Sequence, residues 1–530
     1  MPTLKNGFAQ KLHLCIYHQS SYMSTIRRQS IISSGLVYFG FALGFLNTYL
    51  FTRERGGFST SQYGLYQIFM AIASMMYAVA NLGMQAYIYK FHPYYKDNLP
   101  PEKNDMMTRA LLTSLLGFAG VVLAGIAGKD FVIQKFDANS ADLVRYYYWI
   151  FPFGLGLTLF SLLEAFAWQL KKSILTNFLK EVLFRIFTTV LLVLSFAGVL
   201  ASFDTFIKIY AFLYLALALV LLVYLVSRGD LHFVFSPSRV TKKFIGKVRA
   251  LAFLVWSGGL VFSVSNFFAH LVIAAVVPGG LAVVAIYSLA LYIGSLMQAP
   301  QRVVIAASIG PLSQAWKDKD YGKINRIYHR SSINQLIFSV GMFVLIWINF
   351  TDGVITFGLN HDYLAAQAIF FFVGLKLIVD MGTGLNSQII GTSTFWRFDF
   401  FSGLILLALT LPLNYLLAKK MGGIGPAIAD LFTFAVYNGI RYLFLYRKFK
   451  MQPFTPKSLY TLLLGLAGYF LCKALFSNMH GLLGLTIRST VFCVFYAAGV
   501  LGLRLSEDVL PVWATAKKKI SYICGRFLGR

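Results

Sequence analysis

The chain has 530 residues, of which 58% are hydrophobic and 16% aromatic, while only 13% are charged. Soluble proteins carry roughly 25% charged residues, so this composition excludes an ordinary soluble enzyme and indicates an integral membrane protein. The formal net charge of +27 would suggest nucleic acid as a partner of a soluble protein, but basic residues of membrane proteins gather in cytoplasmic loops. No nucleic-acid partner is therefore expected.

Residues 1–29 are predicted to form a cytoplasmic lead. They lack the uninterrupted apolar run of a signal peptide, because Lys11, His13 and His18 interrupt it. Met23 is a second candidate translation start, since it places Arg27 and Arg28 directly before the first span.

Fourteen apolar segments follow, each long enough to cross a bilayer as a helix, for which about 20 residues suffice. The predicted fold is therefore an all-α polytopic membrane protein. The fourteen segments are 30–50, 63–89, 106–127, 143–170, 174–200, 203–227, 250–276, 281–308, 331–350, 363–390, 400–417, 424–446, 458–476 and 482–503.

Two six-helix lobes related by duplication explain the order of these segments. Tyr63 and Tyr287 occupy equivalent positions 224 residues apart, and this offset relates the first six span starts to the next six. Because six is even, both lobes enter from the same side, as in a parallel repeat. The predicted parts are an N-lobe at 30–227, a linker at 228–249, a C-lobe at 250–446, two further spans within 458–503 and a basic tail at 504–530. Helices of similar length joined by short loops also produce some regularity without duplication.

The repeated feature is clearest at 285–314, AIYSLALYIGSLMQAPQRVVIAASIGPLSQ. This apolar helix is expected to end at Gly310-Pro311 and to be followed by a charged loop with Lys317, Lys323 and Arg330. A fainter version at 63–90 is expected to end in a basic loop containing His92-Pro93.

Lys and Arg outside the spans indicate the orientation. With the N-terminus inside, 32 of them lie in cytoplasmic segments, against seven on the other side. Both termini are therefore predicted to be cytoplasmic, in a multi-pass protein of the cytoplasmic, or inner, membrane. The seven are Arg53, Arg55, Lys129, Lys135, Lys208, Lys419 and Lys420.

No sequence motif of a cofactor site or an enzyme is present: there is no P-loop, HExxH or GxSxG, and the four cysteines have no paired spacing. Neither a catalytic residue nor a metal or cofactor is expected. The glycines at 422–425 fit a tight turn between two helices better than a phosphate loop.

Ionisable residues within spans are the candidate functional residues, because each costs on the order of 3 kcal/mol at a helix centre. Glu181 and Arg185 are four residues apart beside Lys180, and Lys376 and Asp380 are also four apart. Such pairs lie on one helix face and can neutralise each other. They either form self-satisfied pairs or line a polar cavity between the lobes, with cations for an anionic substrate and carboxylates for a coupling ion.

Glu164 and Gln301, which stands beside Arg302, are secondary candidates. Several other charges lie nearer span ends, where long basic side chains can reach the headgroups. Arg302 also lies near a span end and can be interpreted in this way. The other charges near span ends are Arg145, Asp430, Arg441, Lys473 and Arg488. Pro152, Pro300 and Pro412 within spans are expected to kink their helices.

The chain resembles the polysaccharide exporters and lipid-linked oligosaccharide flippases of the multidrug/oligosaccharidyl-lipid/polysaccharide superfamily. The motifs that carry the resemblance are RRQSIISSG at the first span, YGLYQIF and NLGM in the second, and YSLALYIGSLMQAP with IGPLSQ in the eighth. The lipid II flippase branch looks to carry a cation early in the eighth span, where this chain has Tyr287 and Tyr292. That departure argues against a peptidoglycan precursor as the substrate.

The resemblance implies a flippase that moves undecaprenyl-diphosphate-linked oligosaccharide units for O-antigen (lipopolysaccharide), capsule or exopolysaccharide. The expected substrate-binding cations are Arg185, Lys376, Lys180 and Arg302, and the expected carboxylates for a coupling ion, H⁺ or Na⁺, are Glu181, Asp380 and Glu164. The other expected partners are membrane lipids, and rocking of the lobes would give alternating access.

Two other functions remain open. A multidrug antiporter of the same superfamily typically has twelve spans and an acidic site in its N-lobe, whereas the first span here has no acid. A membrane-embedded glycan polymerase normally needs a sizeable extracytoplasmic loop with acidic or Arg residues. The loop at 351–362 offers only Asp352 and Asp362.

Overall fold

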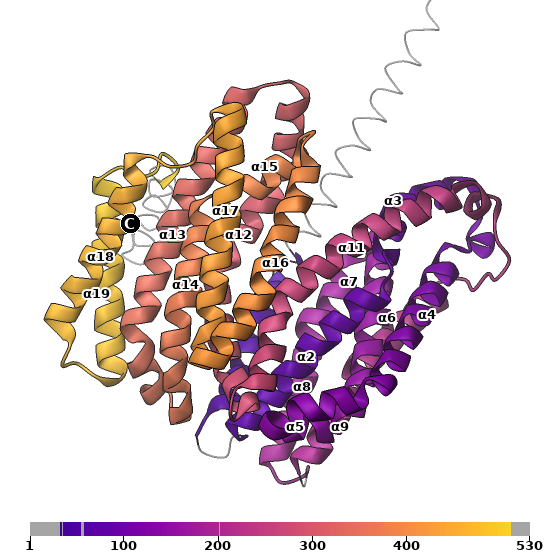
Figure 1. Ribbon diagram of the computed structural model, residues 1–530, viewed down its shortest axis with the longest axis horizontal. Coiled ribbons are helices and arrows are strands. Elements are labelled where there is room, and N and C mark those ends of the chain that lie inside the picture. Colours follow the sequence, from indigo (N-terminus) through magenta and orange to yellow (C-terminus); the bar gives the residue numbers. More distant parts are fainter. Residues whose placement is uncertain (1–31, 34, 55–57, 201, 510–530) are drawn as a thin grey trace, which may run out of the picture. The chain divides into compact units, whose positions relative to one another are not determined.

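The computed structural model describes residues 32–33, 35–54, 58–200 and 202–509. These residues are almost entirely helical (Figure 1), and within them the only β-type pairing is an isolated bridge between Arg53 and Leu359. The expected all-α polytopic fold is confirmed. The cytoplasmic lead, Met23 and the end of the basic tail lie outside the described residues.

The helices follow one another with short connections. In chain order they are the helix Gly35–Thr52, α2 (Thr60–Ala80), α3 (Met84–Asn98), η1 (Pro101–Lys103), α4 (Met106–Ala127), α5 (Lys129–Arg145), η2 (Tyr147–Trp149), α6 (Ile150–Gln169), α7 (Ser173–Asn177), η3 (Phe178–Leu183), α8 (Phe184–Phe196), α9 (Phe203–Ala211), α10 (Leu213–Ser227), α11 (Arg239–Val276), α12 (Gly280–Lys317), α13 (Tyr321–Thr356), η4 (His361–Ala365), α14 (Ala366–Gly382), α15 (Asn386–Thr392), α16 (Trp396–Met421), α17 (Ile424–Phe449), α18 (Pro456–Phe476) and α19 (Gly481–Gly502).

Twelve helices of the described chain are long and apolar enough to cross a membrane. The other two predicted spans, 174–200 and 424–446, are also helical, as α7–η3–α8 and α17. Both carry charges well inside the helix: Lys180, Glu181 and Arg185 in the first, and Asp430 and Arg441 in the second. These charges lower the hydropathy of the two segments, and they also mark where polar chemistry is concentrated.

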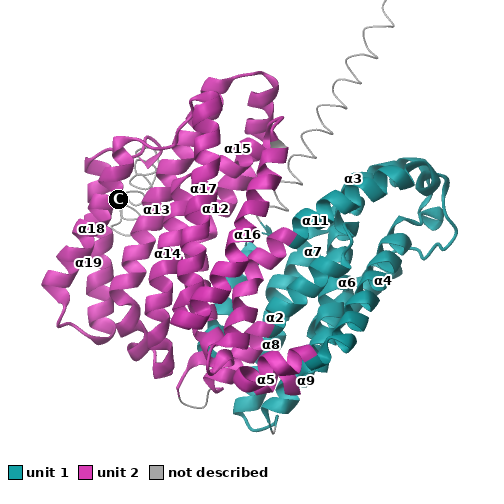
Figure 2. Ribbon diagram, viewed as in Figure 1, with its two compact units in different colours: residues 1–51, 69–130, 146–260 teal, residues 52–68, 131–145, 261–530 magenta. Residues whose placement is uncertain are grey.

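The described residues divide into two compact units (Figure 2). Unit 1 lies within Met1–Phe51, Phe69–Asp130 and Tyr146–Leu260, and unit 2 within Thr52–Ile68, Phe131–Arg145 and Val261–Arg530. In unit 1, α6 packs against α3, α4 and α10 and is the most buried of the candidate spans. In unit 2, α14 packs against α12, α13 and α17, while α18 and α19 pack against α13.

Two predicted helix ends are wrong. Helix α12 continues through Pro311 to Lys317, and α13 begins at Tyr321, so Lys323 and Arg330 are helical and only a short turn separates the two helices. In the earlier stretch the helix breaks at Leu82 and Gly83, which have φ of 45° and 75°, and α3 then continues through His92-Pro93. The predicted linker is likewise helical from Arg239 onward.

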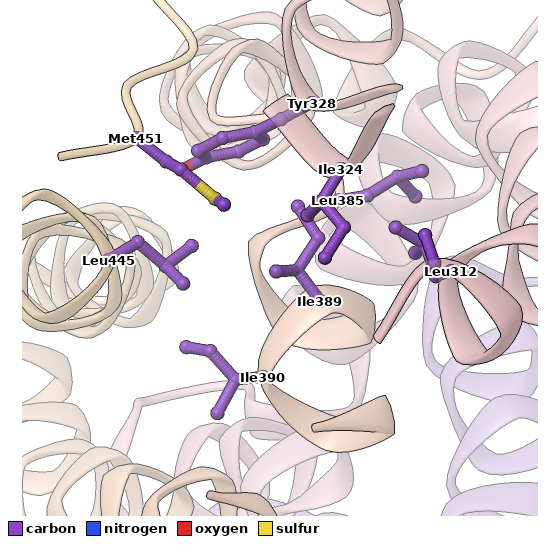
Figure 3. Close-up of a cluster of buried hydrophobic side chains, with 9 residues drawn as sticks. Leu312, Ile324, Tyr328, Leu385, Ile389, Ile390, Leu445 and Met451 are labelled. Atoms are coloured by element: carbon purple, nitrogen blue, oxygen red, sulfur yellow. The ribbon is translucent and has the colours of Figure 1, made fainter. Parts of the chain in front are cut away.

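A buried apolar cluster explains why α12 continues past Pro311 (Figure 3). Leu312 at the end of α12 is fully buried with Ile324 and Tyr328 of α13, Ile389 of α15 and Leu445 of α17. A proline inside a helix costs about 3 kcal/mol, while burial of one large apolar side chain contributes about 1.5–3 kcal/mol. Packing of several such residues offsets the cost and fastens the ends of these helices within unit 2.

Candidate functional site

A π-helical segment carries the first group of predicted site residues, in unit 1. Lys180 and Glu181 belong to η3, between α7 and α8, and Arg185 follows in the first turn of α8. Segments of π-helix are rare and frequently mark functional sites, because the extra residue per turn redirects side chains.

The predicted pairing of Glu181 with Arg185 is confirmed. The Arg185 Nη2 donates to Glu181 Oε2 at 2.9 Å, and about a quarter of each side chain is exposed. The Arg185 carbonyl accepts hydrogen bonds from Asn47 Nδ2 at 2.9 Å and from Thr189 Oγ1 at 2.8 Å. These bonds connect the helix Gly35–Thr52 to α8 beside the ion pair.

A second ion pair links two elements of unit 1. Lys180 Nζ lies 3.3 Å from Glu164 Oε2, which comes from α6. Glu164 is 4% exposed because α6 is surrounded by other helices, and its Oε1 has no hydrogen-bond partner within the described residues. The sequence separation of sixteen residues contains no periodic signal for this pair, since the two residues lie on different helices.

In unit 2, Lys376 does not pair with Asp380. Its Nζ lies 3.1 Å from Asp430 Oδ2 on α17 and 4.1 Å from the ring centroid of Phe434, a cation–π contact. Asp430 is 7% exposed, and Asn414 Nδ2 lies 3.4 Å from its other oxygen. The i,i+4 prediction fails here because α17 supplies a nearer carboxylate.

Asp380 instead accepts hydrogen bonds from two neutral amides. Gln301 Nε2 of α12 donates to its Oδ2 at 2.9 Å, and Asn438 Nδ2 of α17 donates to its Oδ1 at 3.1 Å. Asn438 is itself buried and accepts from Thr383 and Asn386. Within the described residues no cation pairs with Asp380, unlike Glu164 and Glu181.

A third charged group of unit 2 is more buried than its sequence position suggests. Arg441 of α17 is 3% exposed, pairs with Asp399 of α16 and donates from Nε to Ser402 Oγ at 3.1 Å. Snorkelling therefore explains neither Arg441 nor Asp430. The signal that could have identified both is their spacing of eleven residues, which places them on one helix face together with the polar Thr433 and Asn438.

Arg302 differs from the other predicted cations. Its side chain is exposed on α12, and within the described residues it forms no ion pair, although its neighbour Gln301 holds Asp380. It lies 22 residues after Gly280, about 33 Å along the helix, and so near the end of a hydrocarbon crossing of about 30 Å. Arg302 is thus available to an anionic ligand or to headgroups.

Comparison of the folds gives clear neighbours, whereas no protein-family model and no curated protein matches the sequence. A structure titled lipid II flippase MurJ, inward closed conformation, has a TM-score of 0.70 at 16% identity and covers 89% of this chain and 99% of its own. The chain has the same fold as this structure. An inward-facing multidrug resistance MATE family transporter of the MOP superfamily has a TM-score of 0.60 at 14% identity and covers 77% of this chain and 94% of its own.

These neighbours confirm the predicted resemblance at the level of the fold. One of these two structures is a flippase and the other a multidrug resistance transporter. At these identities the likeness shows the fold alone. Tyr287, where a cation would favour the lipid II branch, is 1% exposed and packs edge-to-face on His270 with centroids 5.4 Å apart.

Proposed function

We propose that the chain is a flippase that moves undecaprenyl-diphosphate-linked oligosaccharide units across the cytoplasmic membrane for surface polysaccharide biosynthesis. The observation that carries the proposal is the match to a flippase structure over nearly the whole of that structure, which accounts for more of this chain than the transporter match does. A diphosphate sugar cannot cross hydrocarbon unaided, so a flippase must replace part of its hydration.

The charged groups have distinct roles in this proposal. Exposed Arg302 attracts the diphosphate, and Arg185 and Lys376 exchange their carboxylate partners for phosphate oxygens during the cycle, with Lys180 assisting Arg185. Asp380 takes up the coupling proton or Na⁺, because it is the carboxylate held only by amide donors. Glu181 and Glu164 retain or release Arg185 and Lys180 as the substrate passes. In this proposal both termini lie in the cytoplasm, as the distribution of Lys and Arg predicts.

A reconstituted assay tests this function. The full chain in proteoliposomes with a fluorescent undecaprenyl-diphosphate oligosaccharide should expose inner-leaflet sugar to an external lectin, and Lys376→Ala and Arg185→Ala should lower the initial rate by about tenfold or more. Lys419→Ala, which removes an exposed charge at the end of α16, is the control. Wild-type rates in both site variants would exclude these roles.

The transporter neighbour favours a second candidate, a multidrug or cation antiporter. Deletion of the gene in its own cell separates the two. A flippase deletion should lose surface glycan and accumulate its lipid-linked precursor, whereas an antiporter deletion should leave the glycan intact and increase sensitivity to cationic drugs. Asp380→Asn should abolish the pH or Na⁺ dependence of transport in either case, because the amide keeps the shape and loses the carboxylate that would bind the coupling ion.

A further inference from the structure

A pocket of about 440 Å³ lies between α3, α4 and α11, entirely within unit 1. In Figure 2, α3, α4 and the part of α11 up to Leu260 are teal. Its lining includes Arg109, Arg249, Tyr87, Thr241, Phe253 and Trp256. None of these residues belongs to the ion pairs described above. Guanidinium groups beside hydroxyls and aromatic rings are the side chains that recognise phosphate esters and their attached groups.

Arg249 supplies the uncompensated charge of this pocket. Its side chain is exposed, and within the described part of the chain it forms no ion pair. Arg109 is partly compensated, because its Nε donates to Asp105 Oδ2 at 3.0 Å and its Nη2 to the Phe235 carbonyl at 3.1 Å. Neither contact uses Nη1, so Arg109 retains N–H groups for a ligand.

A hydroxyl chain makes the pocket wall rigid. Tyr87 donates to Tyr95 at 2.8 Å, Tyr95 and Thr241 share a hydrogen bond of 2.7 Å, and Thr241 donates to Asp105 at 2.8 Å. The same Asp105 holds Arg109. This series of hydrogen bonds therefore joins α3, α4 and α11 and fixes the geometry of the Arg109 guanidinium before any ligand binds.

Helix α11 closely approaches the helix break before α3, and this contact forms part of the pocket wall. A Cβ at Gly83 would lie 2.2 Å from the Ala252 carbonyl oxygen, and its φ of 75° also favours glycine. Trp256 donates from Nε1 to the Val79 carbonyl at 3.0 Å, which fixes its indole ring at the pocket.

The depth of the pocket matches lipid headgroups. Counting about 20 residues, one hydrocarbon thickness, back from the end of α11 at Val276 reaches Trp256, a residue type enriched at membrane interfaces. Arg249 then lies about 10 Å further along the helix. Phe253 lies between them with 68% of its surface exposed and lines the same pocket. The exposed Phe253 ring lies one helical turn from the Arg249 guanidinium. This combination suits an occupant with a phosphate and an attached hydrocarbon chain.

We propose that this pocket binds the phosphate headgroup of a membrane lipid, with Arg249 as its main contact. The inference does not depend on the proposed function, because a polyprenyl phosphate and an anionic glycerophospholipid share the chemistry that the pocket recognises. The full chain in phosphatidylcholine nanodiscs tests it with three probes: undecaprenyl phosphate, phosphatidylglycerol and soluble pyrophosphate. Bound probe is counted by native mass spectrometry across a titration.

Arg249→Gln should weaken binding of the preferred probe by about tenfold, the loss of one strong charge-assisted contact, and Arg249→Lys should retain most of the affinity. Lys247→Gln is the matched control, because Lys247 is an exposed cation of the same helix that does not line the pocket; its affinity should stay within about twofold. Preference for undecaprenyl phosphate identifies a carrier lipid, and preference for phosphatidylglycerol a structural lipid.

Equal losses in Arg249→Gln and Lys247→Gln would overturn the proposal, because they would indicate non-specific attraction to a basic surface. Binding of pyrophosphate as tight as that of the lipids would overturn the lipid assignment. Transport in proteoliposomes is measured separately. A chain that flips its substrate and shows no Arg249-dependent binding contradicts the pocket assignment alone, whereas lipid binding without flipping contradicts the proposed function alone.

Discussion

The two units differ in how many of their site ion pairs join separate helices. In unit 1, Glu181 and Arg185 pair within one continuous helical segment, with part of each side chain exposed, and only Lys180 with Glu164 of the site residues described above joins two elements. In unit 2, Lys376 pairs with Asp430 and Arg441 with Asp399, so both pairs join separate helices. A pair within one helix leaves its neighbours free to move, whereas pairs between helices resist their separation. The segment that carries Glu181 and Arg185 is therefore expected to be held less rigidly than α14, α16 and α17 of unit 2.

The largest expected effect breaks a pair between helices. Lys376→Met leaves Asp430 buried without its cation, with the Asn414 amide as its remaining side-chain hydrogen-bond donor among the described residues, and an uncompensated buried charge costs about 3–5 kcal/mol. Thermal unfolding of the purified protein in detergent should show a large drop in Tm. The double variant Lys376→Met/Asp430→Leu should recover most of that loss, because it removes both charges.

Lys208→Met is the matched control for this prediction. Lys208 pairs with Asp204 four residues earlier at 2.6 Å, with both side chains more exposed, and such pairs contribute about 0.3–0.5 kcal/mol. Equal Tm losses for Lys208→Met and Lys376→Met would refute the proposed difference between local and interhelical pairs.

An intermediate effect is expected where unit 1 packs around its local pair. A Cβ at Gly40 would lie 2.5 Å from the Glu181 backbone oxygen, so Gly40→Ala should force the helix Gly35–Thr52 away from η3. Overpacking of this kind costs about 1–3 kcal/mol. Gly120→Ala has no atom within 4 Å of the new Cβ and should stabilise α4 slightly. If Gly40→Ala and Gly120→Ala changed Tm by similar amounts in the same direction, the close contact between Gly40 and Glu181 would be contradicted.

A smaller effect is expected for the local pair itself. Glu181→Gln removes an ion pair within one helix whose side chains are partly exposed, which should cost less than about 1 kcal/mol. The change in Tm should be several times smaller than for Lys376→Met. If Glu181→Gln destabilised the protein as strongly, the local pair would have to be an essential part of the packing of unit 1.

The difference between the units also explains which features could be predicted from sequence. Long apolar runs predict the helices, and the spacing of Glu181 and Arg185 predicts their contact, because both depend on residues near one another in the chain. The same spacing fails for Lys376 and Asp380, since Asp430 lies 54 residues further on and only the packing of α14 against α17 brings it to Lys376. The contact between Lys180 and Glu164 is likewise not predicted by spacing, because packing brings together residues of two different elements.

Helix ends were predictable only where local chemistry decides them. Pro311 normally favours a helix end, but burial of Leu312 and its neighbours overrides it. The break at Leu82 and Gly83 falls inside a continuous apolar run, and the reason for it, the approach of Ala252, lies on another helix. Tertiary contacts thus decide what local preference leaves open.

The smallest expected effect concerns a pair outside the spans and depends on pH. Hydrogen bonds from the Arg330 guanidinium hold the pKa of Asp508 below its ordinary value of 3.8, against the opposing effect of partial burial. Because the folded-state pKa is the lower one, the stabilisation is complete above about pH 5 and is lost as pH falls through about 4 and below. For a half-exposed pair this stabilisation is at most about 1 kcal/mol.

Asp508→Asn should therefore lower Tm slightly at pH 7 and flatten the decline of Tm on acidification, measured by scanning fluorimetry between about pH 3 and 7. The control Asp97→Asn, at an exposed site on α3, should follow the wild type. A steeper acid decline in Asp508→Asn would show that the pair does not stabilise the folded protein.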